Sequence, residues 1–480
     1  MTTREEIIAL CATNPEVVAD MLLTLQASNL KLLERMQALE ERLNKNSQNS
    51  DKPPSSDGLR KRPRKPKPIR NSKKRKQGGQ QGHAGSTLKI SSDVDHVVRH
   101  AVDQCQQCGH NLAQIDGRVV QQRQVLDIPP PRIVRTEHQL VARVCPCCQT
   151  SNNGQLPADL KGTVQYGPRL RALVVYLMIY QLLPYKRTQE VLKTLYAVKP
   201  STGTLNRILQ DGYKQLEEAE KAIREAIIQA KVVHCDETGH RVGAKTRWLH
   251  VASTKLLTFY HSNKARGSLA HQAADVLPDY KGIAVHDFYR SYLILSCQHG
   301  LCNAHLLREL KAVIEREPHQ LWAKAVVRLL QTANRLVKAA KAQDKWSLSA
   351  PAQKRIVTIY DRLLRQADTL NPLAAPNGRR GRTKQTKTRN LVSRLLQYKQ
   401  DILRFTYDFN VPFDNNLAER DLRMVKVQQK ISNCFRSELG AKIFCRIRGY
   451  ISTCLKQEYE LFPVLANVMQ GNVFIPIPAE

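Results

Sequence analysis

The chain has 480 residues and a formal net charge of +33, with 75 Lys and Arg against 42 Asp and Glu. The length predicts about three domains, and a basic surplus of this size indicates nucleic acid as a partner, because phosphate contacts release condensed counterions. A membrane protein is excluded by the longest apolar run, Leu173–Leu183, which is too short to span and is interrupted by Gln181. Met1–Leu10 lacks the pattern of a secretory signal, so the 12 cysteines are expected to be reduced.

Residues 1–47 are predicted to form a coiled coil. Two heptad series, offset by three residues, make an a/d seam: Leu22, Asn29, Met36 and Leu43 in one, and Leu25, Leu32 and Leu39 in the other. Asn29 at an a position would fix a parallel dimer in register. The alternative is an ordinary amphipathic helix that packs on its own domain.

Residues 48–92 form a basic linker that is expected to be disordered when free. Eleven Lys or Arg lie between Arg60 and Lys76, interleaved with prolines, so no apolar core can form there. Lys73, Lys74 and Arg75 are candidate DNA contacts, and the alternative is a solvated tail.

Residues 93–160 are predicted to form a small β module that holds one structural Zn²⁺. Cys105 with Cys108 and Cys145 with Cys148 are pairs two residues apart, and two such pairs complete a closed tetrahedral site. Cys147 is a fifth candidate, so the choice between Cys147 and Cys148 stays open. Alternating apolar residues predict strands at Val94–Val98 and Arg118–Ile128.

Residues 161–230 are predicted to form a helical DNA-binding domain. Helices are expected at Pro168–Leu183, at Lys186–Tyr196, from Ser201 or Thr202 to Leu209, and at Glu217–Lys231. The tight turn before the third helix resembles a helix-turn-helix, which would direct Thr204, Asn206 and Arg207 to a DNA groove. Packing within a core is the alternative.

Two apolar strands, Lys231–Asp236 and Gly282–Asp287, are each predicted to end in an aspartate, and strand ends are where open α/β sheets place their active sites. Further strands are expected at Arg247–Ser253 and Leu256–His261. A third carboxylate, Glu419, lies on a predicted helix, and the helix also carries Arg420 and Arg423 as candidate DNA contacts.

The helix that carries Glu419 is predicted to begin at Asp414 as its N-cap. Three carboxylates from separate elements can hold two hard divalent cations such as Mg²⁺ or Mn²⁺ and leave positions open for a phosphodiester. Any one acid alone would be assigned to a surface charge or a salt bridge. The three together predict catalysis at Asp236, Asp287 and Glu419, in a core formed by residues 231–317 and 406–480.

Residues 318–405 are predicted to be a helical insertion between the second and third acids. Its basic loop offers Arg379 and Arg380 as contacts to the DNA backbone, with a solvated loop as the alternative. Before the insertion, Cys302 and His305 have the spacing of metal ligands, although core or phosphate-facing roles are favoured there. Arg308 is a candidate phosphate contact because its donor fork is planar.

Several motifs resemble those of the transposases of insertion-sequence family sixty-six. They are the linker at 49–58, the glycine segment Gly79–His83, the cysteine pairs, Tyr166–Ala172 with Pro184–Arg187, Asp236–Thr238 and Asp414–Arg420. The resemblance covers most of the chain. It implies a ribonuclease-H-like catalytic domain in which Asp236, Asp287 and Glu419 form the acidic triad, with the Cys302 and His305 pair as a structural feature beside it.

The resemblance also implies DNA cleavage at terminal inverted repeats and joining of the freed 3′-hydroxyl ends to target DNA. Such an enzyme is expected in the bacterial cytoplasm with the nucleoid, as at least a dimer because two ends must be paired, and with possible accessory proteins. Three alternatives remain: a nuclease without strand transfer, a zinc-containing repressor that needs only the first ~230 residues, and an inactive copy.

Overall fold

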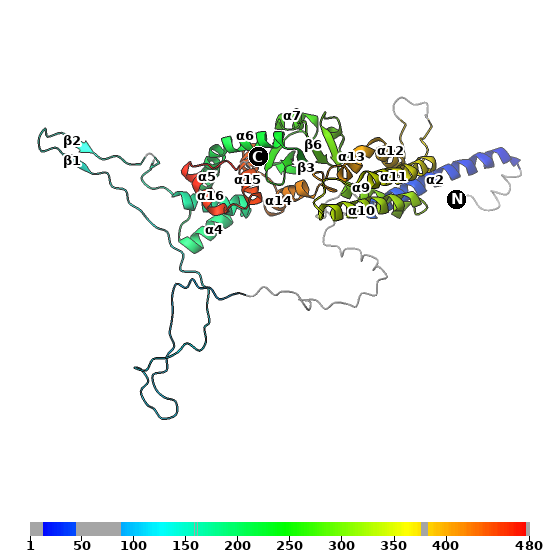
Figure 1. Cartoon of the computed structure of the whole chain (residues 1–480). Helices are drawn as coiled ribbons and strands as arrows, with labels where there is room; N and C mark the ends of the chain where they lie inside the picture. Colours follow the sequence, from blue (N-terminus) through cyan, green and yellow to red (C-terminus); the bar gives the residue numbers. More distant parts are fainter. Residues whose placement is uncertain (1–12, 45–87, 158, 161, 376–382, 477–480) are drawn as a thin grey trace.

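The computed structural model describes residues 13–44, 88–157, 159–160, 162–375 and 383–476. It contains a long N-terminal helix, an extended segment and a main body (Figure 1). The body begins at Pro168 and consists of helices around one sheet. Among the described residues, no helix is both long and apolar enough to cross a membrane.

The N-terminal helix α2 (Pro15–Asn44) is the one predicted. Its seam residues Leu22, Leu25 and Leu32 are 58%, 59% and 55% exposed in the single chain. Within the described residues nothing covers this apolar seam, so the coiled coil remains a prediction about a second copy.

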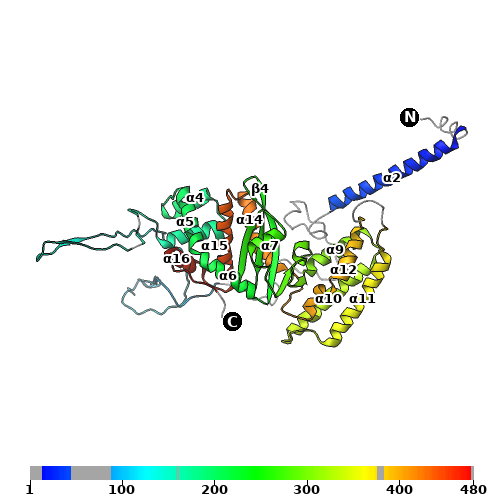
Figure 2. The same cartoon turned by 90° about the horizontal axis from the view of Figure 1, so that it is seen from above.

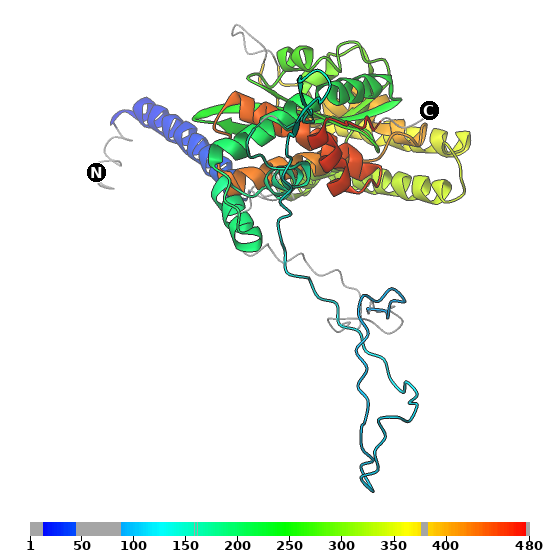
Figure 3. The same cartoon turned by 90° about the vertical axis from the view of Figure 1, so that its left-hand side faces the viewer.

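The extended segment reaches away from the body (Figure 3). Its only strands among the described residues are the short antiparallel pair β1 (Ala142–Val144) and β2 (Ser151–Asn153). The predicted strands at Val94–Val98 and Arg118–Ile128 are wrong. Alternation gives a strand where one face is buried against a partner, and here the apolar side chains are exposed, as at Val125 (90%).

The predicted helical region is helical throughout, in more pieces than expected. It comprises α3 (Pro168–Val175), the π-helix η2 (Tyr176–Tyr180), α4 (Tyr185–Tyr196), α5 (Thr202–Gln215) and α6 (Glu217–Gln229). Ser201 is the N-cap of α5, and its hydroxyl accepts a hydrogen bond from the Thr204 N–H (3.0 Å). The first helix ends before Leu183 because it widens into the π turn, after which Leu182 takes a positive φ of 61°.

Five strands form one mixed sheet in the order β5-β4-β3-β6-β7. They are β3 (Val232–Val242), β4 (Lys245–Ser253), β5 (Thr258–Asn263), β6 (Ile283–His286) and β7 (Gln298–Leu301). β3, β4 and β5 pair antiparallel, whereas β6 and β7 run parallel to β3. The prediction that the first strand ends at Asp236 is wrong, because pairing with β4 continues β3 to Val242.

One set of helices lies next to the sheet, and a second set forms a separate lobe. Those next to the sheet are α7 (Ser268–Ala274), α8 (Arg290–Leu293), α14 (Asn416–Ser432), α15 (Glu438–Lys456) and α16 (Leu461–Gln470). The second lobe holds α9 (Asn303–Arg316), α10 (Leu321–Lys341), α11 (Ala350–Leu370), α12 (Lys387–Gln397), α13 (Lys399–Leu403) and the 3-10 turn η3 (Arg404–Thr406). Figure 2 shows the sheet between the α4–α5–α16 helices and this lobe.

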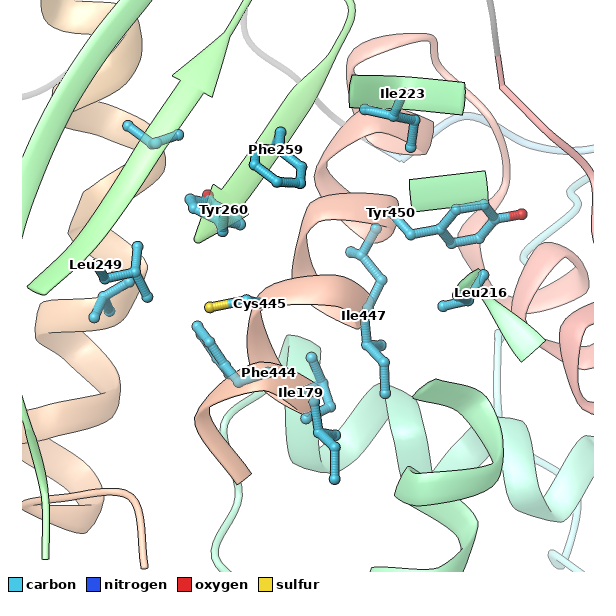
Figure 4. Packing of buried hydrophobic residues seen from close by; sticks show 14 of the residues in the cluster. Ile179, Leu216, Ile223, Leu249, Phe259, Tyr260, Phe444, Cys445, Ile447 and Tyr450 are labelled. Carbon is cyan, nitrogen blue, oxygen red and sulfur yellow. The ribbon is translucent and has the colours of Figure 1, made fainter. Parts of the chain in front are cut away.

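Two apolar cores hold these parts. The first runs from Ala172 to Met469 and joins the helices before the sheet, the sheet itself and the C-terminal helices. In Figure 4, Ile223 of α6, Phe259 of β5 and Ile447 of α15 converge in it. Burying such side chains stabilises the fold by about 1.5–3 kcal/mol each. The helices α3–α6 therefore share one core with the sheet, and the second lobe has its own, around Trp322 and Tyr360.

One buried amide joins the start of α14 to the sheet. The Asn415 side chain donates to the carbonyl of Cys235 (2.8 Å) and accepts from Nδ1 of His234 (2.9 Å). The predicted N-cap at Asp414 is corrected: Asn415 is the N-cap position, and its side chain bonds to β3 instead of to the helix. Asp414 accepts from the Asn416 N–H (3.2 Å). The first turn of α14, which carries Glu419, is thereby fixed beside Asp236.

Replacing Asn415 with Ala is expected to destabilise the fold by about 1–3 kcal/mol for each of the two buried groups left unpaired, at His234 and Cys235. Chemical denaturation would measure the change in the free energy of unfolding. The matched control is Asn416→Ala at the exposed neighbouring position, which should stay within about 0.5 kcal/mol of the parent chain. Equal effects of the two substitutions would contradict this role of Asn415.

Candidate active site

The two aspartates belong to neighbouring parallel strands: Asp236 lies within β3, and Asp287 directly follows β6. β3 and β6 pair Val232 with Ile283 and His234 with Val285, so the same register brings Asp236 opposite Asp287. Parallel pairing stops at His234, and β6 ends one residue before Asp287. Asp236 accepts from the Glu237 N–H (2.9 Å), and Asp287 accepts from the Tyr289 N–H (2.8 Å), which orients both carboxylates.

Glu419 reaches the same region from the first turn of α14. Its Oε1 lies 3.6 Å from Nε2 of His305 and 3.7 Å from a guanidinium nitrogen of Arg308. Both distances exceed a normal hydrogen bond, and Oε1 is buried without a hydrogen-bond partner among the described residues. An acceptor of this kind is unsatisfied until a cation or a donor approaches it.

The three carboxylates repel one another. Burial raises the pKa of Asp236 well above its usual range, and the charges of Glu237, Asp287 and Glu419 raise it further. All three donors are hard oxygen atoms, the type that Mg²⁺ and Mn²⁺ prefer. Within the described part of the chain, one group of His, Cys, Asp or Glu side chains has all its ligand atoms within 4.8 Å of one another, and it consists of Cys302, His305 and Glu419. The three acids of the triad do not meet this criterion, so they are more widely spread than the ligands of a single ion.

Glu237 follows Asp236 but has a separate role that the sequence did not indicate. Its side chain, 1% exposed, accepts from the Tyr292 hydroxyl (2.6 Å) and pairs with Arg266 (2.8 Å). Arg266 in turn stacks over the rings of Trp248 and Tyr289, with its guanidinium carbon 4.6 and 4.1 Å from the centroids. Adjacent strand residues point to opposite faces, so Glu237 anchors β3 from the face opposite Asp236.

A group of buried histidines lies beside Asp287. His286 and His271 pack against Tyr292 with ring centroids 4.8 and 4.7 Å apart, and Nε2 of His286 meets Nδ1 of His299 at 3.0 Å. Burial lowers the pKa of His286 to about 3 and that of His271 to about 4. These rings are therefore neutral at neutral pH and leave the charge of the aspartates uncompensated.

Residues 163–443, more than half of the chain, match the model described as Transposase IS66 family. The chain belongs to the IS66 transposase family. Residues 103–149 match the zinc-finger binding domain of transposase IS66, which supports a structural zinc, and residues 4–89 match a family of unknown function. No curated protein matches the chain.

The first cysteine turn of this IS66 transposase has a defined hydrogen-bond pattern. The N–H of Cys105 donates to the carbonyl of His110 (2.8 Å), and the N–H of Gly109 donates back to the carbonyl of Cys105 (2.9 Å). Gly109 takes a positive φ of 73°, which a glycine adopts without strain. Hydrogen bonds from the backbone lower the pKa of Cys105 and favour the thiolate, the form that binds metal.

The second turn repeats the pattern, which favours Cys148 over Cys147 as the ligand. Cys145 donates to the carbonyl of Thr150, and the N–H of Gln149, at φ 56°, donates back to Cys145 (both 2.9 Å). Cys148 therefore stands where Cys108 stands in the first turn, and Cys147 stands where Gln107 does. The four sulfurs of the two turns do not form one cluster among the described residues.

The predicted DNA contacts differ in their surroundings. Arg207 on α5 and Arg420 and Arg423 on α14 are exposed, whereas Arg308 is half-buried beside Glu419. Asn206 accepts from the Tyr185 hydroxyl (3.3 Å), and the Thr204 hydroxyl bonds to that of Ser201 (2.9 Å), so both side chains are engaged within the helices. Lys73, Lys74, Arg75, Arg379 and Arg380 lie outside the described residues.

The equivalence of the two turns makes a paired prediction. Cys148→Ser is expected to lower the zinc content by one equivalent per chain, because a closed structural site needs its fourth thiolate. Cys147→Ser, one position away, should leave the zinc content unchanged. Metal analysis of the purified full-length chain would measure both, and loss of zinc only in the Cys147 variant would reverse the assignment.

Asp236→Asn is expected to raise the free energy of unfolding at neutral pH by roughly 1–3 kcal/mol, by removing a buried charge. Because the folded-state pKa of Asp236 lies above its unfolded value, stability falls as the pH rises from the unfolded pKa through the folded one. Thermal and chemical unfolding from pH 4 upward, in roughly unit steps, would measure this. The control is the exposed Asp279→Asn, and a destabilised Asp236→Asn would count against the repulsion.

Proposed function

We propose that this chain is an active DNA transposase in which Asp236, Asp287 and Glu419 hold two Mg²⁺ or Mn²⁺ ions. The observation that carries the proposal is the convergence of three carboxylates at Asp236, whose pKa is raised by burial and further by the charges of Glu237, Asp287 and Glu419. Two divalent cations, when bound, neutralise this repulsion and assist displacement at phosphorus. The proposal includes a ribonuclease-H-like fold, which the mixed sheet with aspartates on two neighbouring strands supports.

Within this proposal the residues divide the work of cleavage and joining. Asp236 would help to hold both ions, and Asp287 and Glu419 would each help to hold one. The same site cleaves the phosphodiester at an element end and then accepts the freed 3′-hydroxyl for attack on target DNA. No side chain forms a covalent bond to DNA, so trapping a phosphotyrosine or phosphoserine link would contradict the mechanism.

The proposed DNA interface combines exposed cations with the zinc module. Arg420 and Arg423 extend from the helix that carries Glu419, so a phosphate near the triad lies within their reach. Arg207, the zinc finger and the basic segments add contacts to the terminal inverted repeats. The exposed seam of α2 supports assembly into at least a dimer, and accessory proteins encoded alongside complete the proposed partners.

Two other functions remain as outcomes of the test. A nuclease would share the triad, and it would cut but fail to join a pre-cut end to a target plasmid. A zinc-containing repressor would bind element ends and be unaffected by substitutions at the triad.

The direct test is mobilisation of a marked element with its terminal repeats between plasmids in bacteria. Asp236→Asn, Asp287→Asn and Glu419→Gln are expected to lower the frequency by at least ~10³-fold, because each leaves a cation without a ligand. End binding, measured by gel shift, should persist in all three. Asp279→Asn is the matched control, since this acid is exposed before β6, and it should mobilise like the parent chain.

A triad variant that mobilises the marker as well as the parent chain would reject the site assignment. Retained cutting without joining of pre-cut ends would instead support the nuclease. Absence of movement by the parent chain, even with the accessory proteins supplied, together with tight end binding would support the repressor.

A further inference from the structure

A second group of ligand-type side chains adjoins the triad. Ligand atoms of Cys302, His305 and Glu419 all lie within 4.8 Å of one another. Cys302 and His305 come from the start of α9 and Glu419 from the start of α14, so residues more than 110 positions apart meet here. The sequence favoured a core or phosphate-facing role for the first two, because the approach of Glu419 was not visible in it.

Two atoms of this group are unsatisfied. Glu419 Oε1 and His305 Nδ1 are both buried without a hydrogen-bond partner among the described residues. Nε2 of His305 lies 3.6 Å from Glu419 Oε1, which is too long for a hydrogen bond. Two nitrogen or oxygen ligands of one tetrahedral zinc, each ~2.1 Å from the metal, are separated by roughly 3.4 Å. The spacing of Nε2 and Oε1 therefore fits two ligands of a common cation.

The sulfur of Cys302 lies among backbone hydrogen-bond donors. It is fully buried and accepts from the Asn415 N–H (3.2 Å), and the backbone near Ala304 and His305 donates to it as well. Metal binding breaks the S–H bond, forms the sulfur–metal bond and releases one proton to solvent.

We propose that Cys302, His305 and Glu419 bind a thiophilic divalent cation, of which Zn²⁺ best matches one sulfur, one nitrogen and one oxygen donor. Three protein ligands leave a fourth position open, unlike the four-thiolate finger. The guanidinium of Arg308 lies 3.7 Å from Glu419 Oε1, so its positive charge repels a cation bound there. The same side chain can bind a phosphate instead. The site is distinct from the zinc finger, and it shares Glu419 with the proposed pair of Mg²⁺ ions.

The proposal has one consequence that rests on the proposed function. Glu419 would serve both the thiophilic ion and the Mg²⁺ pair, so the two kinds of cation are linked through one carboxylate. Zinc bound at this group would raise the Mg²⁺ concentration needed for cleavage.

The test uses Co²⁺ as the probe and the full-length chain with one equivalent of zinc already in its finger. The parent chain is expected to take up one further equivalent of Co²⁺ per chain, with near-ultraviolet thiolate-to-cobalt absorption. Cys302→Ser should abolish that absorption, and His305→Gln should weaken uptake at least ~10-fold. Cys434→Ser is the control, because this half-buried cysteine lies outside the group and should leave the titration unchanged.

Absence of further cobalt uptake by the parent chain, or the same absorption in Cys302→Ser, would overturn the inference. Thermal unfolding verifies that the variants are folded. If Cys302→Ser is not folded, the cobalt uptake of His305→Gln alone tests the inference. The two proposals fail separately. A parent chain that transposes without binding the extra cobalt refutes only this site. If the parent chain binds cobalt and the Asp287→Asn variant keeps full activity, only the triad is refuted.

Discussion

Asn415 hydrogen-bonds through its side chain to two consecutive residues of β3, His234 and Cys235, and through its backbone to the sulfur of Cys302. Its amide orientation is fixed because the NH₂ group donates to a carbonyl, so Oδ1 must accept and His234 must carry its proton on Nδ1. Three segments separated by up to 181 positions meet at this residue. Glu419 lies one helical turn further along, so its distance from Asp236 depends on these bonds.

The electrostatics of the site oppose folding, whereas the packing around it supports folding. Asp236 is pressed against other acids by the strand register, and the nearest histidines are kept neutral by burial. Glu237 is the one acid here with strong partners, Arg266 and Tyr292, and it secures β3 while its neighbour remains unpaired. Functional sites commonly retain such unfavourable charges, which the surrounding core holds in place. The apolar core from Ala172 to Met469 supplies that support.

The sequence predicted the parts of this site that depend on local pattern. Apolar runs located β3 and β6, and an amphipathic stretch located the helix of Glu419. It misplaced the end of β3 because the apolar run stops at Asp236, whereas the strand continues through its antiparallel pairing with β4, where Asp236 lies opposite Val251. The four-residue strand β7 and the partners of Glu237 depend on tertiary contacts, which a single sequence does not contain. The wrong strands at 94–98 and 118–128 had the alternation but no surface to bury.

The second lobe bears on the site through α9. The buried face of that helix, including Leu306 and Leu310, belongs to the core of the lobe, while His305 and Arg308 face Glu419 from the same two turns. Packed cores transmit rigid-body shifts without deforming. Movement of the lobe against the sheet would therefore change the spacing of His305 and Arg308 from Glu419.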